Sequence, residues 1–278
     1  MSYKRVLVMQ DISCVGQCSM AVALPVLAVC GVEACPLPTE ILSTHTGGFW
    51  KPAVTYLDGA LGPIWRHWKE SGIRFDVVYT GYLGSVEAIR TAEIIARELM
   101  EPGGRLVVDP AMGDHGRLYA GLDRKYAAHM ERLCREADII LPNLTEAAML
   151  AGVPWQEKHD EDYVNQIMGN LPQDTVVLTG VGFREGQTGV LLRDRGMVRH
   201  YGHESLGHPC SGTGDLFAAG FVGALCRGRD TYRAAQIAAD FTCRCVKATL
   251  EAPAHWYGVK FEPILPELAQ MVGEQELS

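Results

Sequence analysis

Short apolar runs that alternate with segments of helical length are the feature that most constrains the fold of this chain. The runs are rich in Val, Ile and Leu and are continuous rather than alternating in polarity, which is typical of strands covered on both faces. Strands that alternate with helices predict a mostly parallel sheet flanked by helices. The sequence therefore predicts an α/β fold with strands at 6–9, 75–79, 105–109, 138–141 and 175–179.

Helices are expected between and after these strands, at 17–29, 86–100, 125–134, 215–227 and 232–250. Two further segments, 188–192 and 197–201, flank a polar turn that contains Gly196. This pattern predicts a hairpin at one edge of the sheet. The sequence shows no internal repeat and no obvious linker, so a single domain over residues 1–278 is predicted.

Charge and cysteine content narrow the class of protein. The net charge of −8 disfavours nucleic acid and anionic membranes as partners, because both require a basic face. The nine cysteines include no Cys-x-x-Cys pair, which indicates reduced thiols of a cytosolic protein. The N-terminus lacks the apolar core of a signal peptide, and no apolar run is long enough to cross a bilayer. A cytoplasmic location is expected.

The strongest chemical signal is the Gly-rich segment from Gly207 to Asp215, which leads into an apolar helix. Glycines at a helix start let the backbone approach an anion, and the free N–H groups and helix dipole favour negative charge there. The same dipole is expected to keep Asp215 ionised, so that its carboxylate accepts a proton from an attacking hydroxyl. The alternative is a loop with an acidic helix cap. No Gly-Lys-Ser/Thr follows, which excludes a Walker A loop.

A second polar pair follows the predicted strand at 138–141. Asn143 and Glu146 are three residues apart, so they share one face of a first helical turn. Together they could orient water around Mg²⁺, which keeps most of its water ligands in proteins. The same spacing is also that of a capping box, with Asn143 as the N-cap and Glu146 as its partner. Both interpretations fit these two residues.

In their order and spacing these motifs resemble those of the ribokinase-like kinases, and in particular of the pyridoxal kinase family. The resemblance implies a three-layer α/β/α fold with a mostly parallel central sheet. It extends over nearly the whole chain, and the segments that carry it are Leu42–Phe49, Thr80-Gly81-Tyr82, Val107–Tyr119, Leu141–Glu146, Leu178-Thr179-Gly180 and Gly212–Asp215.

The resemblance assigns a role to each of these segments. Asp215 is the implied catalytic base, with the backbone of Gly212, Thr213 and Gly214 as the anion hole. Thr46 and Tyr82 are implied to contact the acceptor ring. The implied ATP contacts are Asp109, Asp114, Asn143, Thr179 and Gly180. The implied metal contacts are Asp109 and Glu146. A strand-end turn is the alternative for both Asp109 and Asp114, and an ordinary strand-to-turn exit is the alternative at Thr179 and Gly180.

The first strand is followed by Gln10-Asp11-Ile12-Ser13, where many pyridoxal kinases carry Gln-Ser-His and a longer turn. Either Asp11 or Ser13 is therefore expected to supply the polar contact to the ring. The short turn resembles that of hydroxymethylpyrimidine kinases, which typically have Gly-Thr-Gly-Cys in place of Gly-Thr-Gly-Asp215. His45 is expected to cap a turn, with a contact to the ligand as the alternative. Cys210 is expected to pack rather than react, although a thiol at a helix start can have a lowered pKa.

The implied function is phosphorylation of the 5′-hydroxymethyl group of pyridoxal, pyridoxamine or pyridoxine by ATP, with Mg²⁺ and, in some members, K⁺. Family members are commonly homodimers, so a homodimer is expected here. Three alternatives are a hydroxymethylpyrimidine kinase on the same fold, a B6-binding reservoir without activity, and a dehydrogenase. The last is poorly supported, because no complete Gly-x-Gly-x-x-Gly follows the first strand.

Overall fold

The structure, a computed structural model, describes residues 3–207, 210–252 and 254–273. They form a nine-stranded sheet in the order β11-β10-β9-β8-β5-β4-β1-β2-β3, together with the small hairpin β6–β7. Neighbouring strands from β2 to β9 are parallel, whereas β3, β10 and β11 are antiparallel to their neighbours. The strands are β1 (Arg5–Ser13), β2 (Glu33–Leu42), β3 (Val54–Tyr56), β4 (Phe75–Thr80), β5 (Met100–Val108), β6 (Gly113–Asp114), β7 (Arg117–Leu118), β8 (Ile139–Ile140), β9 (Thr175–Thr179), β10 (Gln187–Asp194) and β11 (Met197–Glu204).

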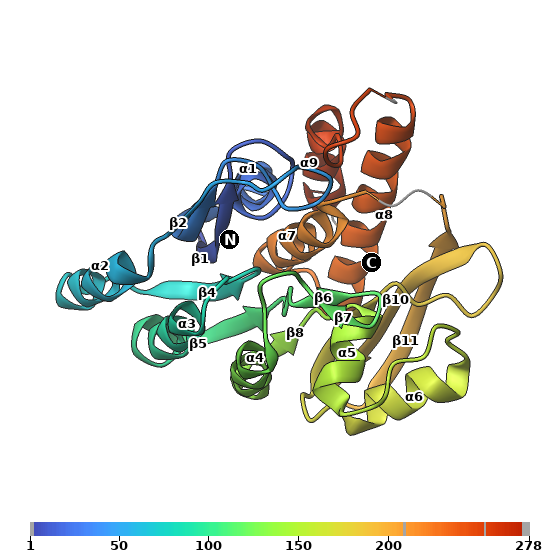
Figure 1. Ribbon diagram of the computed structural model, residues 1–278, viewed down its shortest axis with the longest axis horizontal. Helices are drawn as coiled ribbons and strands as arrows, with labels where there is room; N and C mark the ends of the chain where they lie inside the picture. Colours follow the sequence, from blue (N-terminus) through green and yellow to red (C-terminus); the bar gives the residue numbers. More distant parts are fainter. Residues whose placement is uncertain (1–2, 208–209, 253, 274–278) are drawn as a thin grey trace.

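Helices cover both faces of this sheet and complete three layers (Figure 1). One face carries α1, α7, α8 and α9, and the other carries α2 to α6. The α/β/α architecture and the mostly parallel sheet expected from the sequence are thus confirmed. The helices are α1 (Met20–Val29), α2 (Asp58–Glu70), α3 (Val86–Leu99), α4 (Arg124–Glu136), α5 (Leu144–Ala151), α6 (Glu161–Asn170), α7 (Thr213–Cys226), α8 (Thr231–Leu250) and α9 (Leu265–Gly273), with the short η1 (Glu262–Ile264) before α9.

Two hydrophobic cores lie on opposite sides of the sheet. One packs α1, α7 and α8 against it and includes the fully buried Phe221 and Phe241. The other packs α3, α4 and α6 and includes Ile89 and Met130. Central strands contribute to both, as in β1, where Val6 and Val8 join the first core and Leu7 and Met9 join the second. This explains the continuous apolar runs of the sequence, because successive side chains point to opposite faces of a sheet.

The predicted strands, helices and edge hairpin are all present, but the prediction omitted several elements. Strand β2 contains Pro36 and Pro38, which argue against a strand in a sequence. They fit because β3 pairs only with residues 40–42 of β2, so the prolines lie where β2 has no neighbour on its outer side. Helix α2 was also omitted, since its Gly59, Gly62 and Pro63 are poor helix formers. Among the described residues, no helix is sufficiently long and apolar to span a membrane.

Candidate active site

The Gly-rich segment ends at α7, whose first turn holds the predicted catalytic residues. Gly212 is the N-cap, with φ 87°, and its carbonyl accepts the first helical hydrogen bond from Leu216 N at 3.0 Å. A Cβ on Gly212 would stand 1.9 Å from the Gln17 carbonyl oxygen. Both the backbone conformation and this close packing therefore require glycine. His208 and Pro209 of the same segment lie outside the described residues.

Gly214 differs from Gly212, because the surrounding protein does not require a glycine there. It is the second residue of α7, its φ lies outside the left-handed region, and no described atom lies within 4 Å of the place a Cβ would take. The N–H groups of Thr213, Gly214 and Asp215 belong to the first turn, whose donors have no partner within a helix. The start of α7 thus presents bare backbone donors to open space, an arrangement that suits an anion.

Burial determines the charge state of Asp215. Its pKa is raised to about 7, mainly by burial and to a smaller extent by the negative charge of Asp11, while a hydrogen bond from the backbone of Ser19 acts in the opposite direction. At a pKa of about 7 the carboxylate is only partly ionised at neutral pH in the protein without ligands, so the helix dipole alone does not keep it fully charged. The loss of hydration outweighs the dipole of α7, because a dipole contributes only about 0.3–2 kcal/mol.

Ser19 joins the phosphate side of the site to the acceptor side, and the sequence interpretation missed it. Its backbone lowers the pKa of Asp215 and its side chain lowers the pKa of Asp11, so Ser19 lies next to both carboxylates. Ser19 is the N-cap of α1, is buried, and has φ 49°, which is uncommon for a residue other than glycine. A small polar residue before an apolar helix signals a cap in sequence, but the contact with Asp215 depends on tertiary structure.

Asp11 and Ser13, the two candidates for the ring contact, differ in their hydrogen bonding. Both are buried, and Ser13 Oγ donates to Asp11 Oδ2 at 3.2 Å. Asp11 Oδ1 has no hydrogen-bond partner in the described part of the chain. The backbone N–H of Asp11 donates to the carbonyl of Tyr82 at 3.1 Å, which brings the two predicted acceptor segments together. Asp11 therefore retains a free acceptor atom, whereas the hydroxyl proton of Ser13 is already used.

Glu40 is a further acidic side chain on this side, and the sequence interpretation did not single it out. It is only 3% exposed, and burial raises its pKa to about 7, helped by the negative charges of Asp11 and Asp58. The charge on Glu40 also raises the pKa of Tyr82, after burial itself. A Cβ on Gly84 would stand 2.7 Å from Glu40 Oε2. Glu40, Asp11 and Tyr82 are thus electrostatic neighbours, and we call them the acceptor-side cluster.

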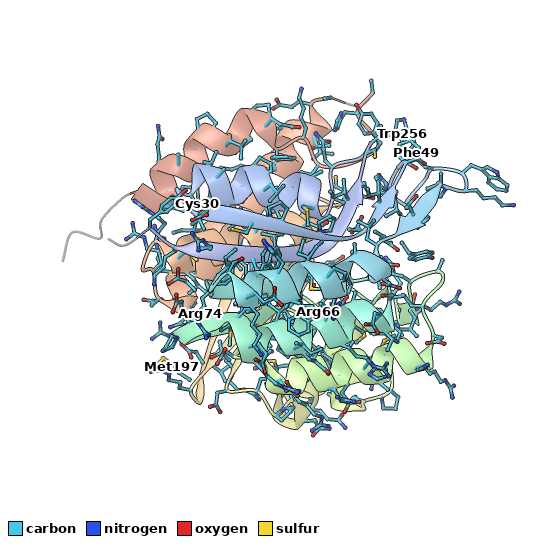
Figure 2. All side chains as sticks on the ribbon, turned by 90° about the vertical axis from the view of Figure 1, so that its left-hand side faces the viewer. Cys30, Phe49, Arg66, Arg74, Met197 and Trp256 are labelled. Atoms are coloured by element: carbon cyan, nitrogen blue, oxygen red, sulfur yellow. The ribbon has the colours of Figure 1, made fainter. Side chains whose placement is uncertain are left out.

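The segment with Thr46 lies beside the Gly-rich segment. Thr46 is exposed, and a Cβ on its neighbour Gly47 would stand 3.1 Å from Ser211 Oγ. His45 is buried and both its ring nitrogens are used, Nδ1 accepting from Gly47 N at 2.9 Å and Nε2 bonding the Tyr257 carbonyl at 2.8 Å. This confirms the turn-capping role expected for His45. In the same region, Phe49 packs on Trp256 with ring centroids 4.8 Å apart (Figure 2).

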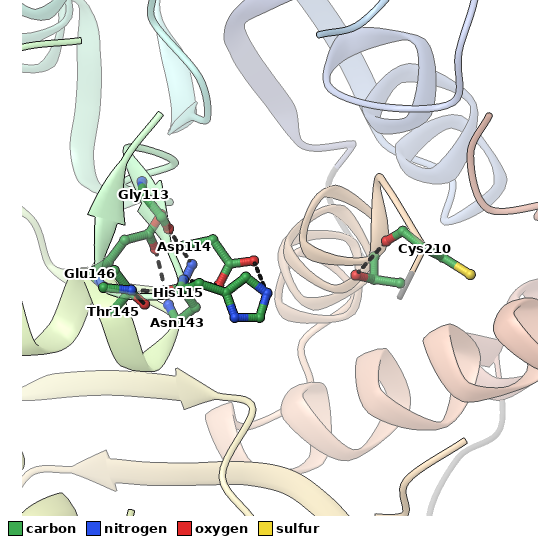
Figure 3. A network of polar contacts seen from close by, with 9 residues as sticks. Gly113, Asp114, His115, Asn143, Thr145, Glu146 and Cys210 are labelled. Carbon is green, nitrogen blue, oxygen red and sulfur yellow. Dashed lines mark hydrogen bonds and ion pairs between the residues drawn. The ribbon is translucent and has the colours of Figure 1, made fainter. Parts of the chain in front are cut away.

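Asn143 and Glu146 form the capping box that was the alternative to a metal site. The Asn143 side chain accepts from Glu146 N at 2.9 Å, and Glu146 Oε2 accepts from Asn143 N at 3.0 Å. The remaining oxygen, Oε1, accepts from Met112 N at 2.9 Å, and Asn143 Nδ2 donates to the Gly113 carbonyl at 2.9 Å. Figure 3 shows the result, in which the β6–β7 hairpin is fastened to the first turn of α5.

Asp109 follows β5 directly and is 8% exposed, with Oδ1 accepting from Ala111 N at 3.2 Å. Burial raises its pKa well above the usual range, and the negative charges of Glu146 and Asp215 act in the same direction. Within the described residues, no three acidic, His or Cys side chains are grouped to hold a metal by themselves. Buried carboxylates without a cation nevertheless fit Mg²⁺, which commonly binds through one or two carboxylates, water and substrate phosphates.

The other predicted nucleotide contacts lie around this network. Asp114 is exposed at the end of β6, and its Oδ1 accepts from His115 N at 2.7 Å. Thr179 ends β9 and forms a backbone bridge with Asn143, so these two predicted contacts are adjacent. Gly180 follows with φ 78°, which requires glycine at the turn.

Cys210 lies on the other side of the network, close to the start of α7 (Figure 3). Its carbonyl accepts a hydrogen bond from Thr213 Oγ1 at 3.3 Å, and burial raises the pKa of its thiol. A raised pKa reduces the fraction of reactive thiolate. The structure therefore agrees with the packing role expected for Cys210.

Comparison with known families places the chain among kinases of small ring alcohols. The model of the phosphomethylpyrimidine kinase family matches residues 69–259. The pyridoxine/pyridoxal/pyridoxamine kinase of Bordetella bronchiseptica is 27% identical over 251 residues, covering 85% of this chain and 86% of that protein. Pyridoxal kinase of Sus scrofa is 32% identical over 161 residues, and that alignment spans about half the length of either protein, 55% of this chain and 49% of the other.

Solved structures agree over nearly the whole length. The crystal structure of pyridoxal kinase from Lactobacillus plantarum is 35% identical to this chain in sequence and superposes with a TM-score of 0.88. The alignment covers 97% of this chain and 98% of that protein. A protein of Bacteroides thetaiotaomicron described as a candidate phosphomethylpyrimidine kinase, crystallised with pyridoxal, is 28% identical with a TM-score of 0.85. The alignment covers 100% of this chain and 98% of that protein.

Proposed function

We propose, since the chain belongs to the phosphomethylpyrimidine kinase family and within it to the pyridoxal kinases, that it transfers the γ-phosphoryl group of ATP to the 5′-hydroxymethyl group of a vitamin B6 vitamer. The acceptor is pyridoxal, pyridoxamine or pyridoxine, and the product is the 5′-phosphate used in pyridoxal phosphate salvage. The observation that carries this proposal is the first turn of α7, where bare amides adjoin Asp215. Ser19 lies next to both Asp215 and Asp11 of the acceptor-side cluster.

Each part of this arrangement has one task in the proposed reaction. The acceptor ring lies against Tyr82 and Thr46, with the free oxygen of Asp11 as its polar contact. Asp215 takes the proton of the hydroxymethyl oxygen as that oxygen attacks the γ-phosphorus in line and the bond to the β-phosphate oxygen breaks. The amides of Thr213 and Gly214 stabilise the negative charge on the transferred group, because fixed backbone dipoles need no reorganisation.

The nucleotide is proposed to lie along the ends of β5, β8 and β9. Asp109 and Glu146 would hold Mg²⁺ directly or through water, and Mg²⁺ would supply charge neutralisation on the phosphates. The proposed triphosphate contacts are Asp109, Asp114, Asn143, Thr179 and Gly180. Dependence on K⁺, a homodimeric state and a cytoplasmic location are proposed on family grounds, and no contact with nucleic acid or membrane is expected at a net charge of −8.

Substitution of Gly214 by alanine tests whether a phosphoryl group is seated on the bare backbone. The fold should accept Gly214→Ala, because no described atom lies within 4 Å of the new Cβ and alanine is the better helix former by about 1 kcal/mol. The methyl group would, however, stand in the path of the phosphoryl group. We expect kcat/KM for ATP and pyridoxine to fall at least about a hundredfold, the size of effect reported for loss of one oxyanion-hole donor.

Gly59→Ala is the matched control for this experiment. Gly59 is likewise the second residue of a helix, α2, with no described atom within 4 Å of a Cβ, and it lies in a different element. Turnover of Gly59→Ala should equal that of the wild type, measured by coupled ADP release. Equal turnover of Gly214→Ala and Gly59→Ala would show that no phosphoryl group binds at the start of α7.

A hydroxymethylpyrimidine kinase is the second candidate, favoured by the description of the matching family model. Side-by-side turnover of pyridoxine and 4-amino-5-hydroxymethyl-2-methylpyrimidine with ATP separates the two functions. A non-catalytic B6-binding protein would bind the vitamers without consuming ATP, and steady-state ADP release distinguishes it from both kinases. The dehydrogenase alternative predicts nicotinamide binding, which a fluorescence titration tests.

A further inference from the structure

Glu40 is a buried carboxylate for which the described protein offers no hydrogen-bond donor. It lies in β2, is 3% exposed, and forms no hydrogen bond or ion pair with any described residue. The charged groups that influence it are Asp11 and Asp58, both acidic. Asp58 itself accepts from Ser85 Oγ at 2.6 Å. No cation of the described chain therefore compensates the charge of Glu40.

A second unpartnered group lies beside it. Asp11 is 4% exposed, and its Oδ1 has no hydrogen-bond partner in the described residues. The side-chain amide of Gln10, the preceding residue, is fully buried and likewise without a partner there. Buried polar groups in folded proteins are nearly always hydrogen-bonded, so Asp11 Oδ1 and the Gln10 amide leave two acceptors and one donor for a bound molecule next to Glu40.

The neighbours of Glu40 place it at the acceptor end of the proposed site. Its carboxylate lies over the backbone of Gly84, two residues after Tyr82, the aromatic residue proposed to contact the ring. The carbonyl of Tyr82 in turn accepts from Asp11 N at 3.1 Å. Asp11 and Asp215, the proposed base, both lie next to Ser19, which lowers the pKa of each. A ring held between Tyr82 and Asp215 would therefore present its substituents to Glu40.

We propose that Glu40 is a specificity-determining residue that binds an amino group of the acceptor, and that the chain prefers ring alcohols that carry such a group. This inference rests on the function proposed above and identifies its substrate class. Two acceptors share this chemistry, pyridoxamine with an alkylammonium group and 4-amino-5-hydroxymethyl-2-methylpyrimidine with a ring amine. Pyridoxine, which has a hydroxyl in place of the amine of pyridoxamine, offers a weaker donor and no charge.

The test is the ratio of kcat/KM for each amine-bearing acceptor to kcat/KM for pyridoxine, with saturating ATP. The wild type should favour at least one amine-bearing acceptor over pyridoxine. Separate ratios for pyridoxamine and for 4-amino-5-hydroxymethyl-2-methylpyrimidine show which of the two it favours. Glu40→Gln should lower that ratio about ten- to hundredfold, because a hydrogen bond to a charged group is replaced by one to a neutral amide. Glu33→Gln, the same change in a half-buried residue of β2 that bonds Arg5, should leave the ratio unchanged.

The outcomes separate this inference from the proposed function. If the wild type phosphorylates vitamers but Glu40→Gln leaves the ratio unchanged, the role of Glu40 is refuted and the kinase function stands. If the wild type phosphorylates no ring alcohol, the proposed function fails first. Should Glu40→Gln prove unstable in a thermal melt, the wild-type ratios still decide, since a preference for pyridoxine over both amines would overturn the inference.

Discussion

Asp215→Asn should make the ligand-free protein more stable while abolishing most of its turnover. Burial raises the pKa of Asp215 to about 7, whereas an aspartate in an unfolded chain titrates near about 3.9. The folded state therefore binds more protons than the unfolded state between these two values. Stability consequently falls as the pH rises through this window, and the full penalty is present above the folded-state pKa.

The size of the penalty follows from linkage. A difference of about three pKa units corresponds to a penalty of about 4 kcal/mol at pH 8 and about 1.5 kcal/mol at pH 5. Asparagine is isosteric and uncharged, so it avoids the penalty, although burial of its amide offsets part of the gain. We expect Asp215→Asn to raise the free energy of unfolding by about 2–4 kcal/mol at pH 8, or about 5–10 °C in Tm for a chain of this size.

Thermal melts at pH 5 and pH 8, without nucleotide or Mg²⁺, measure this effect. The Tm difference between variant and wild type should shrink by at least half at pH 5. Asp162→Asn, at an exposed position in α6, is the control and should show no such pH dependence. Coupled ADP release should show a loss in kcat of about 10²–10⁴, the usual contribution of a general base.

Two results would refute this reasoning. If Asp215→Asn melts at the wild-type temperature at pH 8, the carboxylate is not destabilised by burial. If the stabilisation is the same at both pH values, it has a cause other than the charge. Unchanged turnover would independently remove Asp215 from the role of base.

Two further predictions concern the same turn. Gly212→Ala should lower both Tm and turnover, because its Cβ would stand 1.9 Å from the Gln17 carbonyl oxygen at φ 87°; a melt that matches the wild type would contradict the close packing. For the wild type, kcat/KM with pyridoxine should fall about tenfold per pH unit below about 7, because only ionised Asp215 accepts the proton; a pH–rate profile that is flat down to pH 5 would argue against it.

The sequence predicted the parallel sheet well, since its strands are apolar on both faces and bounded by helices. It missed β2, because whether Pro36 and Pro38 are tolerated depends on which part of the strand has an outer neighbour. That neighbour, β3, is itself only three residues long. Such pairing is a tertiary property that local composition does not encode.

The candidate site shows a similar division. Both interpretations of Asn143 and Glu146 were visible from their spacing, and the capping box is now observed. The raised pKa of Asp215 could not be predicted, because its position in the helix is visible in the sequence but the loss of hydration around it is not. Glu40 was missed because one glutamate within a strand resembles any solvated residue until its neighbours are known.

Ser19 has a consequence for how activity can be lost. A single residue at the start of α1 lies next to both the proposed base, Asp215, and the acidic group that would touch the ring, Asp11. If the first turn of α1 frays, the base and the ring contact are disturbed in the same event. Changes in this turn should therefore lower turnover of every acceptor together rather than shift the preference among acceptors.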